Sequence, residues 1–409
     1  MKKILYISYD GMTDPLGQSQ VLPYLTALSK EGYQFTILSF EKANRYDKEK
    51  SIIERICAGA SIYWVPLTFT KRPPVLSKIY DRWRLKRKAE QLFRESRFDM
   101  IHCRSYIAAE AGLLLKKKYG ARFLFDMRGF WADEKVDSGQ WNQQSLFFRR
   151  VYRHYKSKEK EFLQNADAIV SLTEAARLEL LAKEEYRNLL IDVIPCCADL
   201  AHFNYHTIKA DVAPRLKEQL GIRPEYKIIT YLGSVGGWYM IEEMFSFFKR
   251  LLERQPEFMM LMLTKDAPDL VRKQAIASGV PVDRLVILYS GRNELPGYIS
   301  LSDCSIFFIK PTYSKIASSP TKHAELMGMG VPVICNNIGD TGRIIGETNT
   351  GLVVNGFTTE EYDRVIGKMD TLLSIPKKQI REAAYNYFDL EEGAIHYKKI
   401  YKIILNSDQ

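Results

Sequence analysis

Short apolar runs bounded by glycine, proline or charge alternate with longer stretches in which apolar residues recur every three or four positions. In the first half, the short runs predict strands at 4–8, 34–40, 61–66, 100–103, 122–125, 168–172 and 191–195. The longer spacing predicts helices between them, at 21–30, 106–118 and 174–182. Repeated strand–helix units form parallel sheets with helices on both faces, so this half predicts a doubly wound α/β domain.

The same pattern restarts in the second half of the chain. Its short apolar runs predict strands at 227–232, 258–263, 284–288, 305–309, 331–335 and 352–354. The polar stretch 204–223 has no strand pattern, and we interpret it as a linker. The fold prediction is therefore α/β, with two Rossmann-like doubly wound domains, residues 1–205 and 206–385, facing a central cleft.

Composition narrows the class of protein. The 409 residues are 46% hydrophobic and 26% charged, which is typical of a packed globular protein. The first apolar run meets Asp10 too early for a secretory signal, and no later run approaches the roughly 20 apolar residues of a membrane helix. Six cysteines without a CxxC pair favour the reducing cytoplasm, so we do not expect a secreted or membrane-spanning protein.

Positive charge is concentrated in the first half. Residues 1–200 hold 34 Lys and Arg against 25 Asp and Glu, whereas residues 201–409 hold 25 against 24. Residues 71–97 alone hold ten bases and three acids, interleaved with aromatic residues such as Tyr80 and Trp83. This segment suits peripheral attachment to the anionic inner face of the cell membrane, and a solvated helix explains it equally well. No zinc-finger spacing or RNA-binding strand motif accompanies it, so we expect no nucleic-acid partner.

Two glycine-containing loops follow predicted strands, where parallel sheets bind ligands. The first loop, 10–20, lacks the GxGxxG pattern of a nicotinamide site; Gly17 and Gln18 are candidate acceptor contacts, and a structural turn is the alternative. The second loop has a stronger phosphate-loop pattern but lacks the Walker lysine, which excludes a P-loop NTPase. Its candidate donor-binding residues are Gly233, Ser234, Gly236 and Gly237.

The segment 315–334 carries the clearest candidate site. Ser319 followed by Pro320 predicts a helix start, with the serine as N-cap. The positive end of that helix favours an anion such as a diphosphate. Glu325 would lie about 7 Å further along the helix, where a carboxylate can accept both hydroxyl groups of a ribose; a surface ion pair with Lys322 is the alternative. The candidate anion-binding residues are Ser318, Ser319, Thr321 and Lys322.

In the first domain, four polar residues end neighbouring predicted strands: His102, Arg104, Asp126 and Arg128. Asp126, Arg128 and His102 are the catalytic candidates, and Arg104 is a candidate acceptor contact. His102 can relay a proton and Arg128 can hold an acceptor phosphate. For His102, a buried core histidine is an equally good explanation.

Several of these segments resemble one family. The pattern 320–334, with its glycine and proline spacing, resembles the E-A-M-A-x-G-x-P-V signature of the retaining glycosyltransferase family 4, which has the GT-B fold. Residues 194–200 with Phe203, 99–102 and 126–131 are similar to further segments of that family. The ending 386–409 resembles the family's last helix, which crosses back to the first domain. The chain departs from the family pattern in two respects. Ala317 replaces a glutamate that contacts the donor sugar, and the arginine and lysine that bind diphosphate after the family's glycine loop are missing after Gly233. Lys315 and Lys322 are the nearest candidates to replace these two basic residues.

The resemblance implies a retaining, metal-independent glycosyltransferase of the hexosyl or N-acetylhexosaminyl type, without a cofactor. Its donor would be a nucleotide-diphosphate sugar, and its acceptor a hydroxyl of a glycan or polyprenyl-linked glycan. The expected setting is surface polysaccharide assembly in the cytoplasm. Two alternatives stay open: a nucleotide-sugar epimerase of the same fold, and a non-catalytic nucleotide-binding protein.

Overall fold

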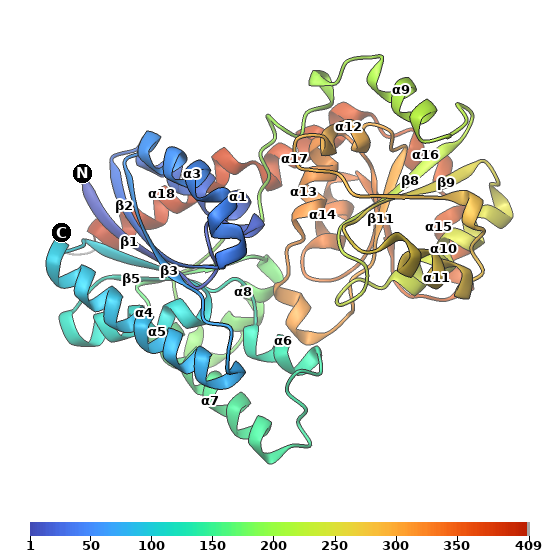
Figure 1. Cartoon of the computed structure of the whole chain (residues 1–409). Helices are drawn as coiled ribbons and strands as arrows, with labels where there is room; N and C mark the ends of the chain where they lie inside the picture. Colours follow the sequence, from blue (N-terminus) through green and yellow to red (C-terminus); the bar gives the residue numbers. More distant parts are fainter. Residues whose placement is uncertain (407–409) are drawn as a thin grey trace. The chain divides into compact units, whose positions relative to one another are not determined.

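The computed structural model describes residues 1–406, apart from the side chains of Pro74 and Val75, and comprises two compact units (Figure 1). The first unit contains Met1–Pro195 and the chain from Leu390 onward, and the second is Cys196–Asp389. The chain therefore crosses between the units at 195/196 and 389/390, not at 205/206 and 385/386 as predicted. The reason is packing: Leu200 and Phe203 are buried in the core of the second unit, where Arg381 donates hydrogen bonds to both of their carbonyl oxygens.

A seven-stranded, fully parallel sheet forms the centre of the first unit, in the order β3-β2-β1-β4-β5-β6-β7. Its strands are β1 (Lys2–Ser8), β2 (Tyr33–Glu41), β3 (Ile62–Thr68), β4 (Met100–Arg104), β5 (Phe123–Asp126), β6 (Ala168–Ser171) and β7 (Ile191–Val193). The central strands are buried on both faces, which explains their unbroken apolar sequences. The predicted doubly wound parallel sheet is confirmed.

Helices cover both faces of this sheet, with α3 and α18 on one side and α4 and α5 on the other (Figure 1). The helices of the unit are α1 (Pro15–Gln20), α2 (Leu22–Ser29), α3 (Ala43–Gly59), α4 (Pro74–Ser96), α5 (Ser105–Tyr119), α6 (Trp131–Asp137), α7 (Leu146–Asn165), α8 (Glu174–Leu181) and α18 (Leu390–Asn406). The C-terminal helix α18 packs against α2 and buries Tyr397, Ile400 and Tyr401 in this unit.

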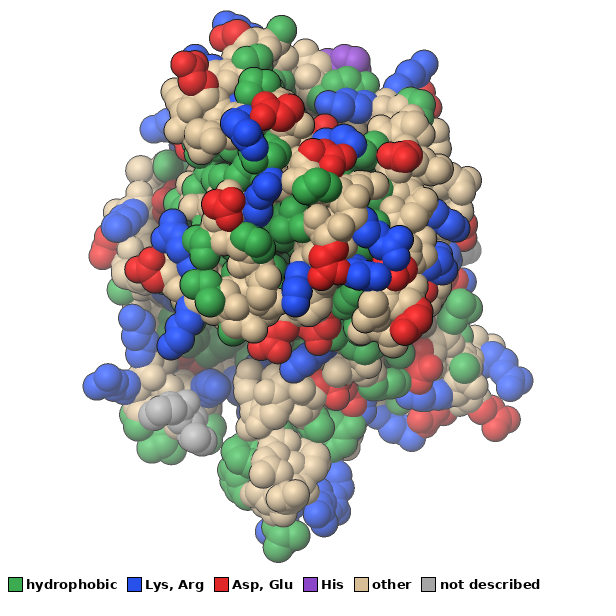
Figure 2. Space-filling model, turned by 90° about the vertical axis from the view of Figure 1, so that its right-hand side faces the viewer, with side chains coloured by type: hydrophobic (Ala, Val, Ile, Leu, Met, Phe, Trp, Pro, Cys, Tyr) green, Lys and Arg blue, Asp and Glu red, His purple; other side chains and the backbone are tan. Residues whose placement is uncertain are grey.

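The second unit is built on a six-stranded parallel sheet in the order β10-β9-β8-β11-β12-β13. Its strands are β8 (Lys227–Leu232), β9 (Phe258–Leu263), β10 (Leu285–Leu288), β11 (Cys304–Phe307), β12 (Val333–Asn336) and β13 (Gly351–Val354). Its helices are α9 (Val212–Gln219), α10 (Ile241–Arg254), α11 (Pro268–Ala277), α12 (Leu295–Ile299), α13 (Thr321–Gly328), α14 (Thr341–Thr348), α15 (Thr359–Ile366), α16 (Met369–Leu373) and α17 (Lys377–Phe388). Figure 2 shows basic and acidic side chains interspersed over one face of this unit.

The predicted linker at 204–223 is wrong. These residues belong to the second unit and include α9, which packs against α12, with Val212 and Leu216 next to Gly297. The apolar residues on the packed face of α9, among them Val212 and Leu216, are too few to give a recognisable helical pattern in a polar stretch. Among the described residues, no helix is long and apolar enough to cross a bilayer.

Candidate functional site

The strand order of the second sheet reverses between β8 and β11, and in open parallel sheets such a reversal marks the ligand-binding edge. The glycine loop leaves the carboxyl end of β8. The segment that leads into α13 follows β11 through the short 3₁₀ helix Tyr313–Ala317. Both candidate donor segments therefore start at this edge.

Gly233 brings the two segments into contact. Its φ of 126° is open only to glycine, and a Cβ atom there would lie 2.6 Å from Nζ of Lys322. Two amides of the loop are already bonded within the protein, because Gly233 N donates to the carbonyl oxygen of Leu263 and Val235 N donates to the Asp266 carboxylate. The expected cradle of backbone amides is thus only partly available, and Gly233 mainly makes room for a lysine.

The N-cap assignment for α13 is corrected by the structure. The helix begins at Thr321 with Pro320 as N-cap, one residue later than predicted. Ser319 Oγ instead accepts a hydrogen bond of 3.1 Å from the backbone N–H of Cys196. That bond ties the approach to α13 to the first residue of the second unit. Ser318 and Thr321, on either side, are partly exposed.

Lys322 has a buried amine that packs on aromatic rings. Its Nζ lies 4.4 Å from the ring centre of Tyr231 and 3.4 Å from that of Tyr239, and it donates a 3.4 Å hydrogen bond to the Tyr231 hydroxyl. Burial lowers the pKa of this amine well below its usual value, although the charge of Glu325 opposes the shift. The tyrosine rings stabilise the ammonium less than a carboxylate would, so an arriving anion would gain from pairing with it.

Glu325 lies one turn further along α13 and keeps 13% of its side chain exposed. Its Oε1 is 3.8 Å from Nη1 of Arg292, a loose ion pair rather than a hydrogen bond. Burial raises the pKa of Glu325, while the charges of Arg292 and Lys322 lower it. The carboxylate is thus close to cations and still has oxygen atoms able to accept further hydrogen bonds.

Lys315 and Ala317 lie on the 3₁₀ helix before α13. Lys315 is 6% exposed, and its Nζ is 3.8 Å from the ring centre of Trp238 on the glycine loop. Ala317 is buried and supplies no carboxylate where the resembling family has one. The glycine loop and the α13 segment therefore meet at two lysine–aromatic contacts.

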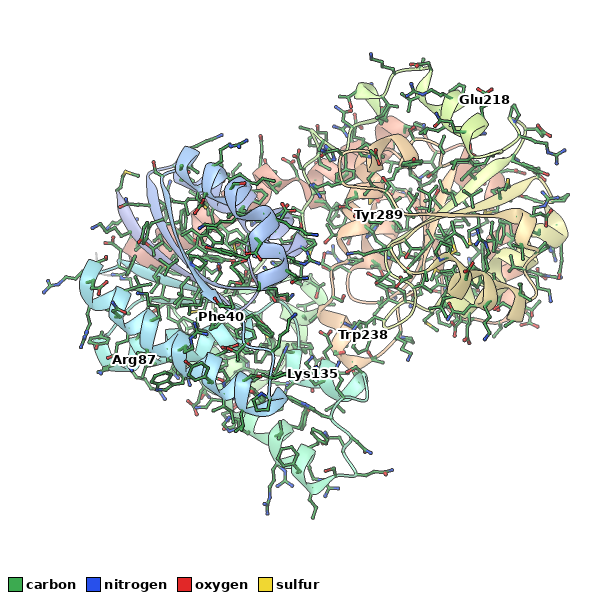
Figure 3. The ribbon with its side chains drawn as sticks, in the orientation of Figure 1. Phe40, Arg87, Lys135, Glu218, Trp238 and Tyr289 are labelled. Carbon is green, nitrogen blue, oxygen red and sulfur yellow. The ribbon has the colours of Figure 1, made fainter. Side chains whose placement is uncertain are left out.

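A pocket of about 130 Å³ opens beside the glycine loop, and the sequence reasoning missed most of it. It is lined by residues from loops after three neighbouring strands, among them Gly233, Ser234, Thr264, Lys265, Tyr289 and Ser290. Tyr289 is 68% exposed and lies on a different loop from Trp238 (Figure 3). No motif marks these residues, because the pocket results from three loops that are far apart in sequence.

The four candidates of the first unit do come together. Asp126 lies at the centre, 3.6 Å from His102 Nε2, 3.8 Å from Arg104 Nη1 and 3.7 Å from Arg128 Nη1. Burial alone would raise the pKa of Asp126, but the Arg128 charge and the neighbouring His102 and Arg104 lower it below its usual value. Arg104 Nε also lies 3.9 Å from the Asp10 carboxylate, so the two guanidinium groups of this cluster face two carboxylates.

Two tyrosines of α18 complete this cluster and were not predicted. The Tyr401 hydroxyl lies 2.7 Å from Nδ1 of His102, and the Tyr397 hydroxyl donates to Asp126 at 3.1 Å. Burial lowers the pKa of His102, although the neighbouring Asp126 opposes the shift, and only 2% of the residue is exposed. His102 therefore has the setting of a buried, hydrogen-bonded histidine.

The loop after β1 is held by a buried carboxylate. Glu41 accepts hydrogen bonds from the amides of Met12 and Thr13 at 2.8 and 3.0 Å. A Cβ atom on Gly17 would lie 2.3 Å from the carbonyl oxygen of Gly11, so this glycine permits close packing of α1 on the loop. Gln18 is partly exposed next to Thr13, whose carbonyl oxygen is 3.4 Å from Nε2. A structural turn accounts for Gly17, and Gln18 stays a candidate contact.

Comparison with known proteins gives matches over both units. Residues 19–202 match the family model described as Glycosyltransferase Family 4, and residues 212–387 match Glycosyl transferases group 1. A curated relative, the D-inositol 3-phosphate glycosyltransferase of Rhodococcus jostii (strain RHA1), is 20% identical over 273 residues. That match covers 65% of this chain and 57% of the relative's length.

Solved structures share the whole fold. Sucrose-phosphate synthase from Thermosynechococcus elongatus superposes with a TM-score of 0.73 at 15% identity, covering 100% of both chains. Anabaena Alr3699/HepE, in complex with UDP and glucose, gives a TM-score of 0.69 at 13% identity, covering 98% of this chain and 100% of that one. Together with the two doubly wound units, these likenesses show the GT-B fold.

Proposed function

Because this chain belongs to the group 1 glycosyltransferases, we propose that it transfers a sugar from a nucleotide-diphosphate donor to a hydroxyl of a glycan or lipid-linked acceptor. The observation that carries the proposal is the buried amine of Lys322, packed on tyrosine rings against Gly233 and followed by Glu325 one helical turn on. This arrangement suits a ligand with an anion beside a diol.

On the donor side, the diphosphate would lie at the start of α13, against Lys322 and Lys315. Glu325 would accept the ribose hydroxyls, and the pocket beside Tyr289 would take the base. The UDP and glucose named for the Anabaena protein support a nucleotide diphosphate as the leaving group. With Ala317 in place of the family's glutamate, the sugar itself must be held by other groups.

On the acceptor side, Arg104 and Arg128 would bind a phosphate. Arg104 is 5% exposed, and its Nη1 is buried without a hydrogen-bond partner, so an acceptor phosphate would satisfy it. A relative named for D-inositol 3-phosphate supports a phosphorylated acceptor. We assign to His102 and Tyr401 the role of orienting Asp126, because both nitrogens of the histidine face groups within the protein.

The proposed chemistry retains the anomeric configuration. As the glycosidic bond to the diphosphate breaks, negative charge grows on the leaving oxygen, and the two lysines would stabilise it in place of a divalent metal. The proposed setting is assembly of a surface polysaccharide at the cytoplasmic face of the membrane.

Calorimetry with nucleotide diphosphates tests the donor assignment. Glu325→Ala should weaken binding by about 1–3 kcal/mol, the typical cost of losing a hydrogen bond to a charged group. Glu218→Ala, at an exposed position of α9 in the same unit, is the matched control and should bind normally (Figure 3). Equal affinities for both variants would refute the ribose assignment.

Sugar transfer with the best-binding donor tests the reaction itself. Activity should persist in EDTA, and a strict need for Mg²⁺ would contradict charge stabilisation by lysines. Incubation with the donor alone distinguishes a transferase from an epimerase, because only an epimerase would convert the sugar of the donor without an acceptor. Because the buried Ala317 lacks the carboxylate of the resembling family, the non-catalytic alternative needs its own test. A protein that only binds nucleotide would transfer no sugar to any acceptor in a panel of acceptors.

A further inference from the structure

The first half of α4 exposes an apolar stripe on the side opposite its packed face. The stripe residues follow helical spacing, and each is more than half exposed: Leu76, Ile79, Tyr80 and Trp83. The packed side is buried to 4% exposure or less: Ser77, Asp81 and Leu85. This helix therefore has an apolar outward face in addition to the side that contacts the unit.

Beyond the stripe, the outward face of α4 becomes polar, and its arginines are accompanied by exposed Gln91 and Glu95. Arg87 and Arg94 continue it in the second half, and the Arg87 guanidinium lies 5.3 Å from the ring centre of Trp83. Arg87 extends from the outer side of the helix in Figure 3. By contrast, Arg82 and Lys86 form ion pairs with the buried carboxylate of Glu110, so their charges serve the unit itself.

Helix α7 repeats this order. Its first turn exposes Leu146 and Phe147 by 71% and 63%, and the next outward positions are arginines 149, 150 and 153. A hydrogen bond of 3.1 Å from Arg82 to the Tyr155 hydroxyl joins α7 to α4. Figure 1 shows the N-terminal end of α7 projecting from the side of the first unit that carries α4.

We propose that the first unit docks on an anionic lipid bilayer through these two helices. The docking surface consists of Leu76, Ile79, Tyr80, Trp83, Leu146 and Phe147, with Arg87, Arg149, Arg150 and Arg153 beside them. Leucine and phenylalanine at the helix tips enter the acyl boundary, tyrosine and tryptophan lie at the headgroup level, and the arginines pair with lipid phosphates.

Charge complementarity selects a bilayer as the occupant. The excess of bases lies in residues 1–200, whereas residues 201–409 are nearly neutral. A protein partner would need acidic groups at specific positions opposite the arginines. The projecting end of α7, with arginines next to its apolar tip, needs only a deformable anionic surface. Membrane docking rests on the proposed function in one respect only: it places the enzyme where it would encounter a lipid-linked acceptor.

Flotation of the full chain with vesicles tests this proposal without any sugar transfer. We expect binding to vesicles of equimolar phosphatidylcholine and phosphatidylglycerol, and much less to phosphatidylcholine alone. Trp83→Gln with Phe147→Gln should lower the partition coefficient about tenfold or more, because interfacial aromatic burial is lost. Arg87→Gln with Arg150→Gln and Arg153→Gln should lower it about 100-fold, at roughly fivefold per arginine.

The matched controls use α11, which also exposes apolar and basic side chains. Leu270→Gln with Ile276→Gln, and Arg272→Gln with Lys273→Gln, should leave vesicle binding unchanged. Nucleotide affinity measured on every variant verifies folding and separates this proposal from the donor site. Three results would overturn the proposal: no binding by the parent chain, equal binding to neutral vesicles, or self-association that the α4 and α7 variants abolish.

Discussion

At the scale of single residues, the protonation of Lys322 is the property of the second unit that would most affect anion binding. A lysine surrounded by tyrosine rings lacks the hydration that normally keeps it protonated, so burial lowers its pKa. In the proposed donor site, an anion that binds beside Lys322 would add to the negative charge of Glu325 and raise that pKa again. In the proposed donor site, the same residue would cost stability when charged in the free protein and would contribute binding energy when the diphosphate binds.

This coupling predicts proton uptake on nucleotide binding. Between the lowered pKa of the free protein and the raised pKa of the complex, binding adds a proton to Lys322, so affinity should fall as pH rises through that window. Titration calorimetry in buffers of different ionisation enthalpy measures the uptake. Lys322→Gln should abolish it and weaken binding, and the surface variant Lys273→Gln should leave both unchanged. Proton release by the parent protein would contradict the model.

At the scale of elements, α18 supplies groups that the first sheet lacks. Tyr397 and Tyr401 approach Asp126 and His102 from nearly 300 residues away in sequence, and they fill two of the hydrogen-bonding positions of that buried cluster. An unsatisfied buried polar group is costly, so the helix and the polar cluster depend on each other.

We therefore expect Tyr401→Phe to lower the free energy of unfolding by about 1–3 kcal/mol, because His102 Nδ1 loses its partner. Chemical denaturation followed by fluorescence provides the measurement. Ile403→Ala, at an exposed position of the same helix, is the control and should change stability by much less. If Tyr401→Phe were as stable as the parent protein, the hydrogen bond between Tyr401 and His102 would make no contribution to the free energy of unfolding.

Acceptor use should change along with stability. With its orienting tyrosines gone, Asp126 no longer holds Arg104 and Arg128 in one arrangement. Tyr397→Phe should then raise KM for the acceptor while KM for the donor stays constant. A rise in the donor KM instead would place the effect outside the first unit's cluster.

At the scale of the whole molecule, the two units have separate sheets and separate buried cores, and the chain passes between them twice. A ligand that binds only one unit stabilises that unit by mass action. The proposed donor site lies wholly in the second unit, and the α18 contacts lie wholly in the first.

Truncation after Asp389 should separate these contributions. Removal of α18 exposes the polar cluster of the first unit and should lower its unfolding temperature, whereas nucleotide diphosphate should still raise that of the second unit. Differential scanning calorimetry with and without UDP measures both effects. Loss of nucleotide binding on truncation would show that the donor site depends on α18.

The sequence by itself determined the two parallel sheets, since buried central strands must be apolar and the helices between them amphipathic. It also predicted that Gly233, Lys322 and Glu325 would lie near one another, because loops after parallel strands open at the same sheet edge. Only the tertiary structure decided what those residues touch: the tyrosine rings on Lys322, the Glu41 carboxylate on the first loop, the α18 tyrosines on His102 and Asp126. Such contacts join segments far apart in sequence, and no local pattern of hydrophobic, polar or turn residues encodes them.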